Sequence, residues 1–299
     1  GEEKPLMDYM TKIEKRRSER DFRKKGLTDS QIEELKAYFP KAKRLKPEIE
    51  TEILFFNGKD YADRLEGVVG YMGKAFGAPC YIVILSEKTE NHIINAGYLT
   101  EDMILMLTEM GVGNCWLTVV DDVPAKRALL LDTDKEIVSI IACGETKKSD
   151  RGPRLNITNP SQVNVSGRAG NIAPKIPESK MVFDGKWGVE VNWEEPGMDP
   201  LVDKALYAAS LAPSFFNRQP YRFIFDPKYV ILCSGKDALE KEDDTMLDVG
   251  AAMLNFAAVI QEQFRADPQW VIGVPENPEE TGMPEEYEYV AYFPLKKLK

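Results

Sequence analysis

A stretch in the second half of the chain gathers a hydroxyl, two carboxamides and two aromatic rings within a few residues. It reads Leu211-Ala-Pro-Ser-Phe-Phe-Asn-Arg-Gln-Pro-Tyr-Arg222. Pro213 ends a helical pattern over 203–210, and a strand-like run begins at Tyr221. Hydroxyl and carboxamide groups both donate and accept hydrogen bonds, so they suit a heterocycle with alternating C=O and N–H edges. The alternative interpretation is an ordinary Asn/Ser/Pro turn between a helix and a strand.

Basic side chains gather near the start of the chain, in Arg16-Arg-Ser-Glu-Arg20. Guanidinium groups present planar forks of donors that match phosphate oxygens, and the Ser18 hydroxyl adds one more donor. An amphipathic helical pattern from Met7 leads into this segment, and a helix capped by Thr28 or Asp29 follows it. The segment therefore predicts a phosphate site, with a solvated basic face as the alternative.

Composition excludes several classes of partner. The net charge is −10, from 39 basic and 49 acidic side chains, which argues against nucleic acid. The apolar runs 81–85 and 137–142 are far too short to span a membrane, and no signal peptide opens the sequence. Four widely spaced cysteines and a single histidine predict buried thiols in a cytoplasmic protein, without a metal site or a Ser/His/Asp triad.

Long apolar helices and short strands recur at a nearly constant spacing. The helical patterns 95–110 and 247–262 are apolar nearly all round, which predicts buried central helices. Strand patterns at 81–85 and 136–143 correspond to those at 229–233 and 288–293. Gly97 and Gly250 lie 153 positions apart, and Trp116 and Trp270 lie 154 apart, so the sequence predicts an internal duplication.

Two motifs carry a resemblance to a known family. The run Ala-Pro-Ser-x-x-Asn-x-Gln-Pro from Ala212 resembles the flavin-binding loop of the nitroreductase family of FMN-dependent, NAD(P)H-oxidising enzymes. Arg-Arg-Ser-x-Arg from Arg16, followed by a capped helix, resembles the opening of that family. The resemblance implies an α+β, nitroreductase-like fold with two related α/β halves that form an intramolecular pseudo-dimer.

The two halves have kept complementary parts of the family pattern. The first half, residues 1–154, has the arginines but reads Tyr38-Phe-Pro-Lys where the family would show its loop. A crossover linker is expected at 155–198, and the second half, 199–299, has the loop but no arginines at its start. In the family's homodimer each FMN takes arginines from one subunit and the loop from the other. The resemblance thus implies one composite site, one dead site, and a chain that can act as a monomer.

The resemblance also implies the residues that would bind FMN, one per chain. The phosphate would contact the side chains of Arg16, Arg17, Ser18, Arg20, Arg151 and Arg154. The ring would lie against Lys74, Thr118, Val119, Pro213, Ser214, Phe215, Asn217 and Gln219. Lys74 would supply positive charge beside the N1–C2=O edge, and a backbone N–H of Thr118 or Val119 would face N5. An exposed lysine before a strand is the alternative for Lys74.

The implied activity is hydride transfer from NAD(P)H through flavin N5 to a nitroaromatic, a quinone or a similar small acceptor, with no catalytic side chain. Two alternatives remain open. A non-catalytic or degenerate flavin-binding protein is one, because Phe215 and Phe216 are bulky where the family more often has small residues. Oxygen-dependent or dehalogenating flavin chemistry is the other, because it shares every motif quoted above.

Overall fold

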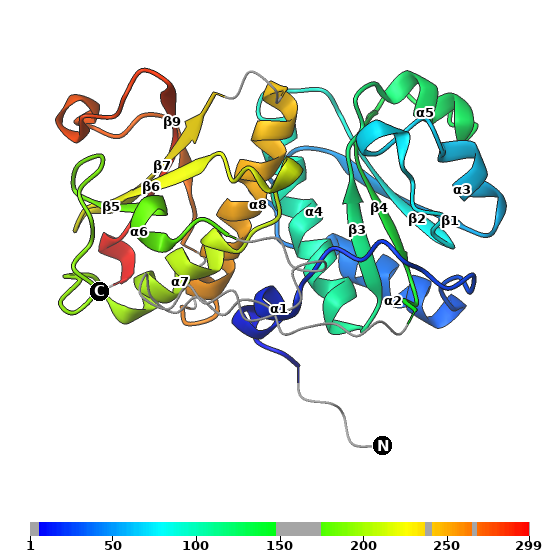
Figure 1. Ribbon diagram of the computed structural model, residues 1–299, viewed down its shortest axis with the longest axis horizontal. Helices are drawn as coiled ribbons and strands as arrows, with labels where there is room; N and C mark the ends of the chain where they lie inside the picture. Colours follow the sequence, from blue (N-terminus) through cyan, green and yellow to red (C-terminus); the bar gives the residue numbers. More distant parts are fainter. Residues whose placement is uncertain (1–5, 148–174, 237–240, 265–267, 299) are drawn as a thin grey trace. The chain divides into compact units, whose positions relative to one another are not determined.

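The computed structural model of the protein describes residues 6–147, 175–236, 241–264 and 268–298 (Figure 1). Contacts within the chain divide it into two units, residues 1–150 and 151–299. Each unit contains one sheet and one long buried helix, so the two are described in turn.

The first unit is built on a four-stranded antiparallel sheet in the order β1-β2-β4-β3. The strands are β1 (Thr51–Asn57), β2 (Cys80–Ser86), β4 (Glu136–Gly144) and β3 (Gly113–Leu117). Strands β2 and β4 are buried along almost their whole length. Because both faces of these strands are covered, their sequences read as continuous apolar runs rather than as an alternation.

Helices cover both faces of this sheet. On one face α4 (His92–Glu109) packs against β2, β3 and β4, and α1 (Tyr9–Lys15) packs on α4. On the other face α3 (Asp60–Leu65) and α5 (Asp122–Ala128) cover an apolar core (Figure 1). Helix α2 (Asp29–Tyr38) begins with the capping box expected there: the Gln31 amide donates to Thr28 Oγ1, and the Thr28 amide donates to Gln31 Oε1.

The second unit has a five-stranded sheet in the order β5-β6-β7-β9-β8. Its strands are β5 (Val182–Asp184), β6 (Tyr221–Phe225), β7 (Tyr229–Gly235), β9 (Tyr287–Pro294) and β8 (Val271–Ile272). Helix α8 (Glu242–Gln261) packs against β6 and against α7 (Pro200–Ser210). Phe256 of α8, Trp270 and Phe293 pack in tilted and edge-to-face arrangements, with ring centroids 4.9–5.3 Å apart, and make an aromatic core.

The sheets of the two units share a pattern. Strands β1-β2-β4-β3 and β6-β7-β9-β8 follow the same order, with antiparallel neighbours throughout. A register shift interrupts β2 and β4 between Ile84 and Leu85, and another interrupts β7 and β9 between Leu232 and Cys233. The strands therefore correspond in order, direction and the position of the bulge, as the repeated spacing predicts.

Part of the expected linker belongs to the second unit. Residues 155–198 read as an aperiodic crossover, but α6 (Glu178–Met181) and β5 lie within this range and pack on the second sheet. Strand β5 pairs in parallel with β6, and its apolar residues Val182 and Phe183 are buried there. The apolar run 181–183 stands out in this range of the sequence, but three residues are too few to show the period of a strand.

None of the helices in the described part of the chain combines the length and the apolar character that a membrane span requires. All four cysteines are buried, as predicted.

Candidate flavin site

The 16–20 segment extends the sheet of the first unit beyond its edge strand β3. Ser18 forms a parallel bridge with Asn114, and the Glu19 amide donates to the Asn114 carbonyl at 2.8 Å. Four residues later, Phe22 forms an antiparallel bridge with Thr146. Backbone pairing at Ser18 and at Phe22 thus fixes the path of the chain on either side of Arg20.

Two of these arginines differ in their exposure to solvent. Arg16 is buried, with 7% of its surface exposed, while Arg20 is exposed and its guanidinium lies 5.7 Å from the ring centre of Phe76. Burial raises the pKa of the Cys115 thiol, and the positive charges of Arg20 and Arg16 oppose that shift. Both charges are therefore close to Cys115 on β3. A buried guanidinium and an exposed one beside the same strand form a set of donors that fits an anion.

A glycine-rich turn places Lys74 in the same unit. The Gly70 amide donates to the Thr118 carbonyl at 2.8 Å, and the Gly67 amide donates to the Gly73 carbonyl at 2.7 Å. Gly70 has φ of 85°, and a Cβ at this position would lie 2.1 Å from the Lys74 carbonyl oxygen, so only glycine fits. Lys74 itself is exposed, and Phe76, two residues later, is the ring beneath Arg20.

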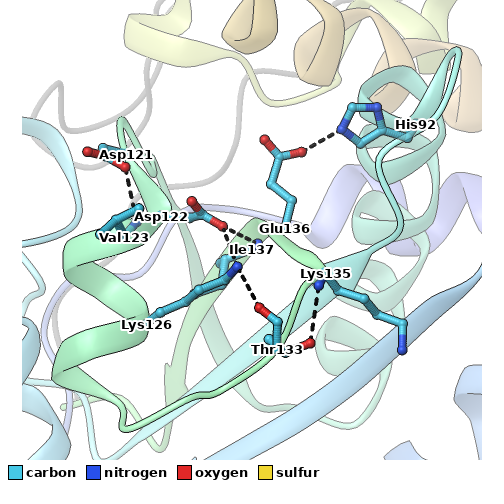
Figure 2. Close-up of polar contacts among 9 residues, drawn as sticks. All are labelled: His92, Asp121, Asp122, Val123, Lys126, Thr133, Lys135, Glu136 and Ile137. Atoms are coloured by element: carbon cyan, nitrogen blue, oxygen red, sulfur yellow. Dashed lines mark hydrogen bonds and ion pairs between the residues drawn. The ribbon is translucent and has the colours of Figure 1, made fainter.

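Polar contacts fix the chain that follows Thr118 and Val119 (Figure 2). The Asp122 carboxylate accepts a hydrogen bond from the Ile137 amide at 3.1 Å and forms an ion pair with Lys126 at 3.3 Å. These contacts tie the start of α5 to the start of β4. Val119 is half-buried against the core beneath, so the backbone at 118–119 is held at both ends.

The only histidine of the sequence connects two elements of the first unit. His92 Nε2 lies 2.5 Å from Glu136 Oε2, and its Nδ1 lies 2.7 Å from the Thr89 carbonyl (Figure 2). It joins the first residue of α4 to the first residue of β4.

The 211–220 loop of the second unit has an unusual backbone. Phe216, Asn217 and Gln219 have φ between 51° and 55°, a backbone region that residues other than glycine rarely adopt. The loop is held in this form by Asp248 on α8, whose two carboxylate oxygens accept from the Phe215 amide at 3.0 and 3.1 Å. Ser214 Oγ accepts from the Gln219 amide at 2.9 Å. Backbone strain maintained by surrounding contacts is common at binding sites.

The two carboxamides expected to face the flavin bond to the protein itself. Gln219 is 1% exposed, and its Nε2 donates to both the backbone and the side-chain oxygen of Asn217 at 3.0 and 3.1 Å. Gln219 Oε1 accepts from the Ile176 amide at 2.9 Å, and Asn217 Oδ1 accepts from Lys175 Nζ at 3.0 Å. The amide group of Gln219 thus donates within the loop, so this side chain stabilises the loop conformation rather than presenting an exposed donor.

Sequence reasoning missed two of these contributors. Asp248 could have been found, because it lies 153 positions after Asn95, whose Oδ1 accepts from the Lys46 amide at 2.8 Å in the first unit. Both residues are buried polar groups on a central helix. Asn95 accepts from the loop that follows α2, and Asp248 accepts from the loop that follows α7. Lys175 gave no signal, because it lies in an aperiodic stretch of the chain.

The structure brings the predicted residues of each unit together separately. In the first unit, Arg16, Arg17, Ser18 and Arg20 lie on one segment, and the Gly70–Thr118 hydrogen bond joins the turn before Lys74 to residue 118. In the second, Pro213, Ser214, Phe215, Asn217 and Gln219 share one loop. Arg151 and Arg154 lie outside the described residues. A composite site made from both units stays a prediction.

The two sheets with their central helices define the class of the protein, a mixed α/β nitroreductase-like fold. A family model described as "Putative TM nitroreductase" matches residues 8–259, and the chain belongs to this family. No curated protein matches the chain.

One solved structure agrees with this fold over nearly the whole chain, and two others are similar to about half of it. A putative nitroreductase from Thermotoga maritima has a TM-score of 0.59 and 17% identity, over 99% of this chain and 97% of that one. An FMN-dependent nitroreductase from Clostridium difficile is 21% identical over 46% of this chain and 88% of its own, with a TM-score of 0.42. A nitroreductase with bound FMN from Desulfitobacterium hafniense is 15% identical over 48% of this chain and 93% of its own, with a TM-score of 0.40.

Proposed function

We propose that the protein is an FMN-dependent oxidoreductase that passes hydride from NAD(P)H to a nitroaromatic, a quinone or a similar small acceptor. Membership of a nitroreductase family supports the class of enzyme. The observation that carries the proposal is the 16–20 segment, which β3 holds in register so that Arg16 and Arg20 both lie near Cys115. Bound FMN would supply the hydride chemistry, so the protein needs to bind and orient its reactants.

The residues of the first unit fit the polar parts of that cofactor. Arg16, Ser18 and Arg20 offer a set of donors for a phosphate, with Arg17 beside them, and the buried Arg16 sits where water competes least. Lys74 would place a positive charge near the ring edge that gains negative charge. In the second unit, the surface of the 211–220 loop would contact the ring through Pro213, Ser214 and Phe215, with Asn217 and Gln219 holding its shape.

We also propose that the chain arose by duplication and works as an intramolecular pseudo-dimer with one flavin site. Two observations support this proposal. The strand order and the bulge recur in both sheets. Asn95 and Asp248, 153 positions apart, both lie in the first half of a central helix and accept a hydrogen bond from a backbone amide of a loop. Each unit has kept only one of the two motifs, so one complete site per chain, and function as a monomer, follow.

A second candidate function is flavin binding without turnover. One observation favours it: the Phe215 and Phe216 rings pack edge to face with centroids 4.7 Å apart, and half of Phe216 is exposed at the loop surface. Bulky rings at this surface would restrict access to a bound flavin.

The visible absorption spectrum of the purified protein with added FMN, recorded before and after NADH or NADPH without air, tests the proposal. We expect flavin bands that bleach on addition of the reductant. Bands that persist with both reductants would favour the non-catalytic candidate, and failure to bind FMN would overturn both. The double variant Arg16→Ala/Arg20→Ala should lose FMN. Arg23→Ala is the matched control, because Arg23 lies in the same stretch but forms an exposed ion pair with Glu145.

A further inference from the structure

Glu178 has a buried carboxyl group that meets no hydrogen-bond donor in the part of the chain that the structure describes. It is 1% exposed, and neither of its oxygens has a hydrogen-bond partner among the described residues. Asp102 shows the usual arrangement, because its buried carboxylate accepts from the Tyr9 hydroxyl, the Tyr38 hydroxyl and the Lys43 amide. An unpaired buried carboxylate is strongly unfavourable, so Glu178 is stable in this position only in its neutral, protonated form.

The surroundings of Glu178 reinforce this preference. Its helix α6 packs on β5, β6 and α7, whose charged residues are Asp184, Arg222, Asp203 and Lys204; α6 itself carries Lys180. Burial and then the negative charge of Asp203 raise the pKa of Glu178 to about 8, and none of the basic groups offsets the shift. Burial also raises the pKa of Asp203.

The chain just before Glu178 contacts the 211–220 loop. Lys175 Nζ donates to the Ala212 carbonyl at 2.9 Å and to Asn217 Oδ1 at 3.0 Å, and the Ile176 amide donates to Gln219 Oε1 at 2.9 Å. Only Pro177, with φ of −60°, separates Ile176 from Glu178. Because proline restricts the connection, docking of α6 and docking of 175–176 on the loop are mechanically linked.

We propose that residues 175–181 form a pH-sensitive clasp on the 211–220 loop, docked while Glu178 is protonated and released when Glu178 gives its proton to solvent. Ionisation would put a second negative charge beside Asp203 in an apolar environment, and undocking α6 would return that charge to water. Release would remove three hydrogen bonds from the loop, so the loop should be firmer at pH 6.5 than at pH 9.0, with little further change above the folded-state pKa of about 8. Only the consequence for flavin affinity rests on the proposed function.

Hydrogen exchange of the cofactor-free protein at pH 6.5 and 9.0, corrected for intrinsic exchange rates, tests the clasp directly. The reporters are peptides that contain the Ile176 amide and the amides of residues 214–219. We expect their protection to fall about tenfold at pH 9.0, while β7 keeps its protection. Equal protection at both pH values would overturn the proposal.

Variants assign the effect to Glu178. Glu178→Gln should abolish the pH dependence, and Glu178→Met should do the same if the glutamine variant does not fold. Asp203→Asn should reduce the loss of protection at pH 9.0, because it removes the negative charge that makes an ionised Glu178 unfavourable in the docked state. Asp184→Asn, an exposed acid on β5, is the control and should behave as wild type. A pH dependence that survives Glu178→Gln or Glu178→Met would refute the assignment, whether or not the protein binds FMN.

Discussion

Asp248 receives the Phe215 amide between its two carboxylate oxygens, at 3.0 and 3.1 Å, and so joins the central helix of the second unit to a loop 33 positions earlier in the chain. The next residue, Phe216, has φ of 53°. A charged acceptor for the Phe215 amide therefore helps to stabilise a backbone form that its residues disfavour by themselves.

The Asp248→Ala variant should lose this support. We expect the free energy of unfolding in urea to fall by about 1.5–3 kcal/mol, the range for a hydrogen bond to a charged group. Asp248→Asn should lose less, because one carbonyl oxygen remains. Asp243→Ala, at an exposed position in the first turn of α8, should change stability by less than about 1 kcal/mol. Equal losses for Asp248→Ala and Asp243→Ala would contradict the role of Asp248.

Gly70 and Gly67 allow a matched comparison within one turn. Both have φ above 80°, but a Cβ at Gly70 would meet the Lys74 carbonyl at 2.1 Å, whereas a Cβ at Gly67 has open space. Gly67→Ala should lower the unfolding free energy by about 1 kcal/mol through backbone strain alone. Gly70→Ala should lower it by clearly more, because the turn must also open. Similar denaturation midpoints for the two variants would show that the turn adapts without cost.

The buried Asp102 carboxylate accepts hydrogen bonds from three groups of the first unit. Removal of the Tyr38 hydroxyl in Tyr38→Phe deletes its 2.6 Å hydrogen bond, and we expect a loss of about 1.5–3 kcal/mol in unfolding free energy. Tyr71→Phe is the control, because Tyr71 is half exposed at the protein surface. Thermal and urea unfolding of both variants would measure the difference, and a Tyr38→Phe protein as stable as wild type would refute the expectation.

Glu178 predicts a dependence of global stability on pH. In the unfolded chain its carboxyl loses a proton near the ordinary pKa of 4.5, but in the folded protein it keeps that proton up to a pKa of about 8. Between these values the unfolded state binds fewer protons, so the contribution of Glu178 to stability falls as pH rises and levels off above pH 8. The slope approaches about 1.4 kcal/mol per pH unit at its steepest.

Urea unfolding of wild type and Glu178→Gln from pH 5 to 9 would measure this contribution as the difference between the two curves. The difference should change across this window in favour of the variant at high pH. A constant difference would mean that Glu178 has the same pKa in the folded and unfolded states.

Local patterns in the sequence determined much of the fold. Several elements depend only on residues a few positions apart. They are the capping box at Thr28, the helix over 95–110, the strands near 81–85 and 221–225, and the helix that precedes the 16–20 arginines. Such features follow from periodicity, caps and propensity, which one stretch of sequence contains in full. The constant spacing between the two halves likewise anticipated the shared strand order.

Only the tertiary structure decided how the polar groups of the 211–220 loop are used. The motif presents Gln219 as a free carboxamide, but its oxygen accepts from Ile176, 43 positions earlier, and its amide hydrogens bond to Asn217. The burial of Glu178 depends in the same way on α7 and the second sheet. A hydrogen bond or a desolvated charge is set by which distant groups meet in space, and sequence spacing alone carries no record of that meeting.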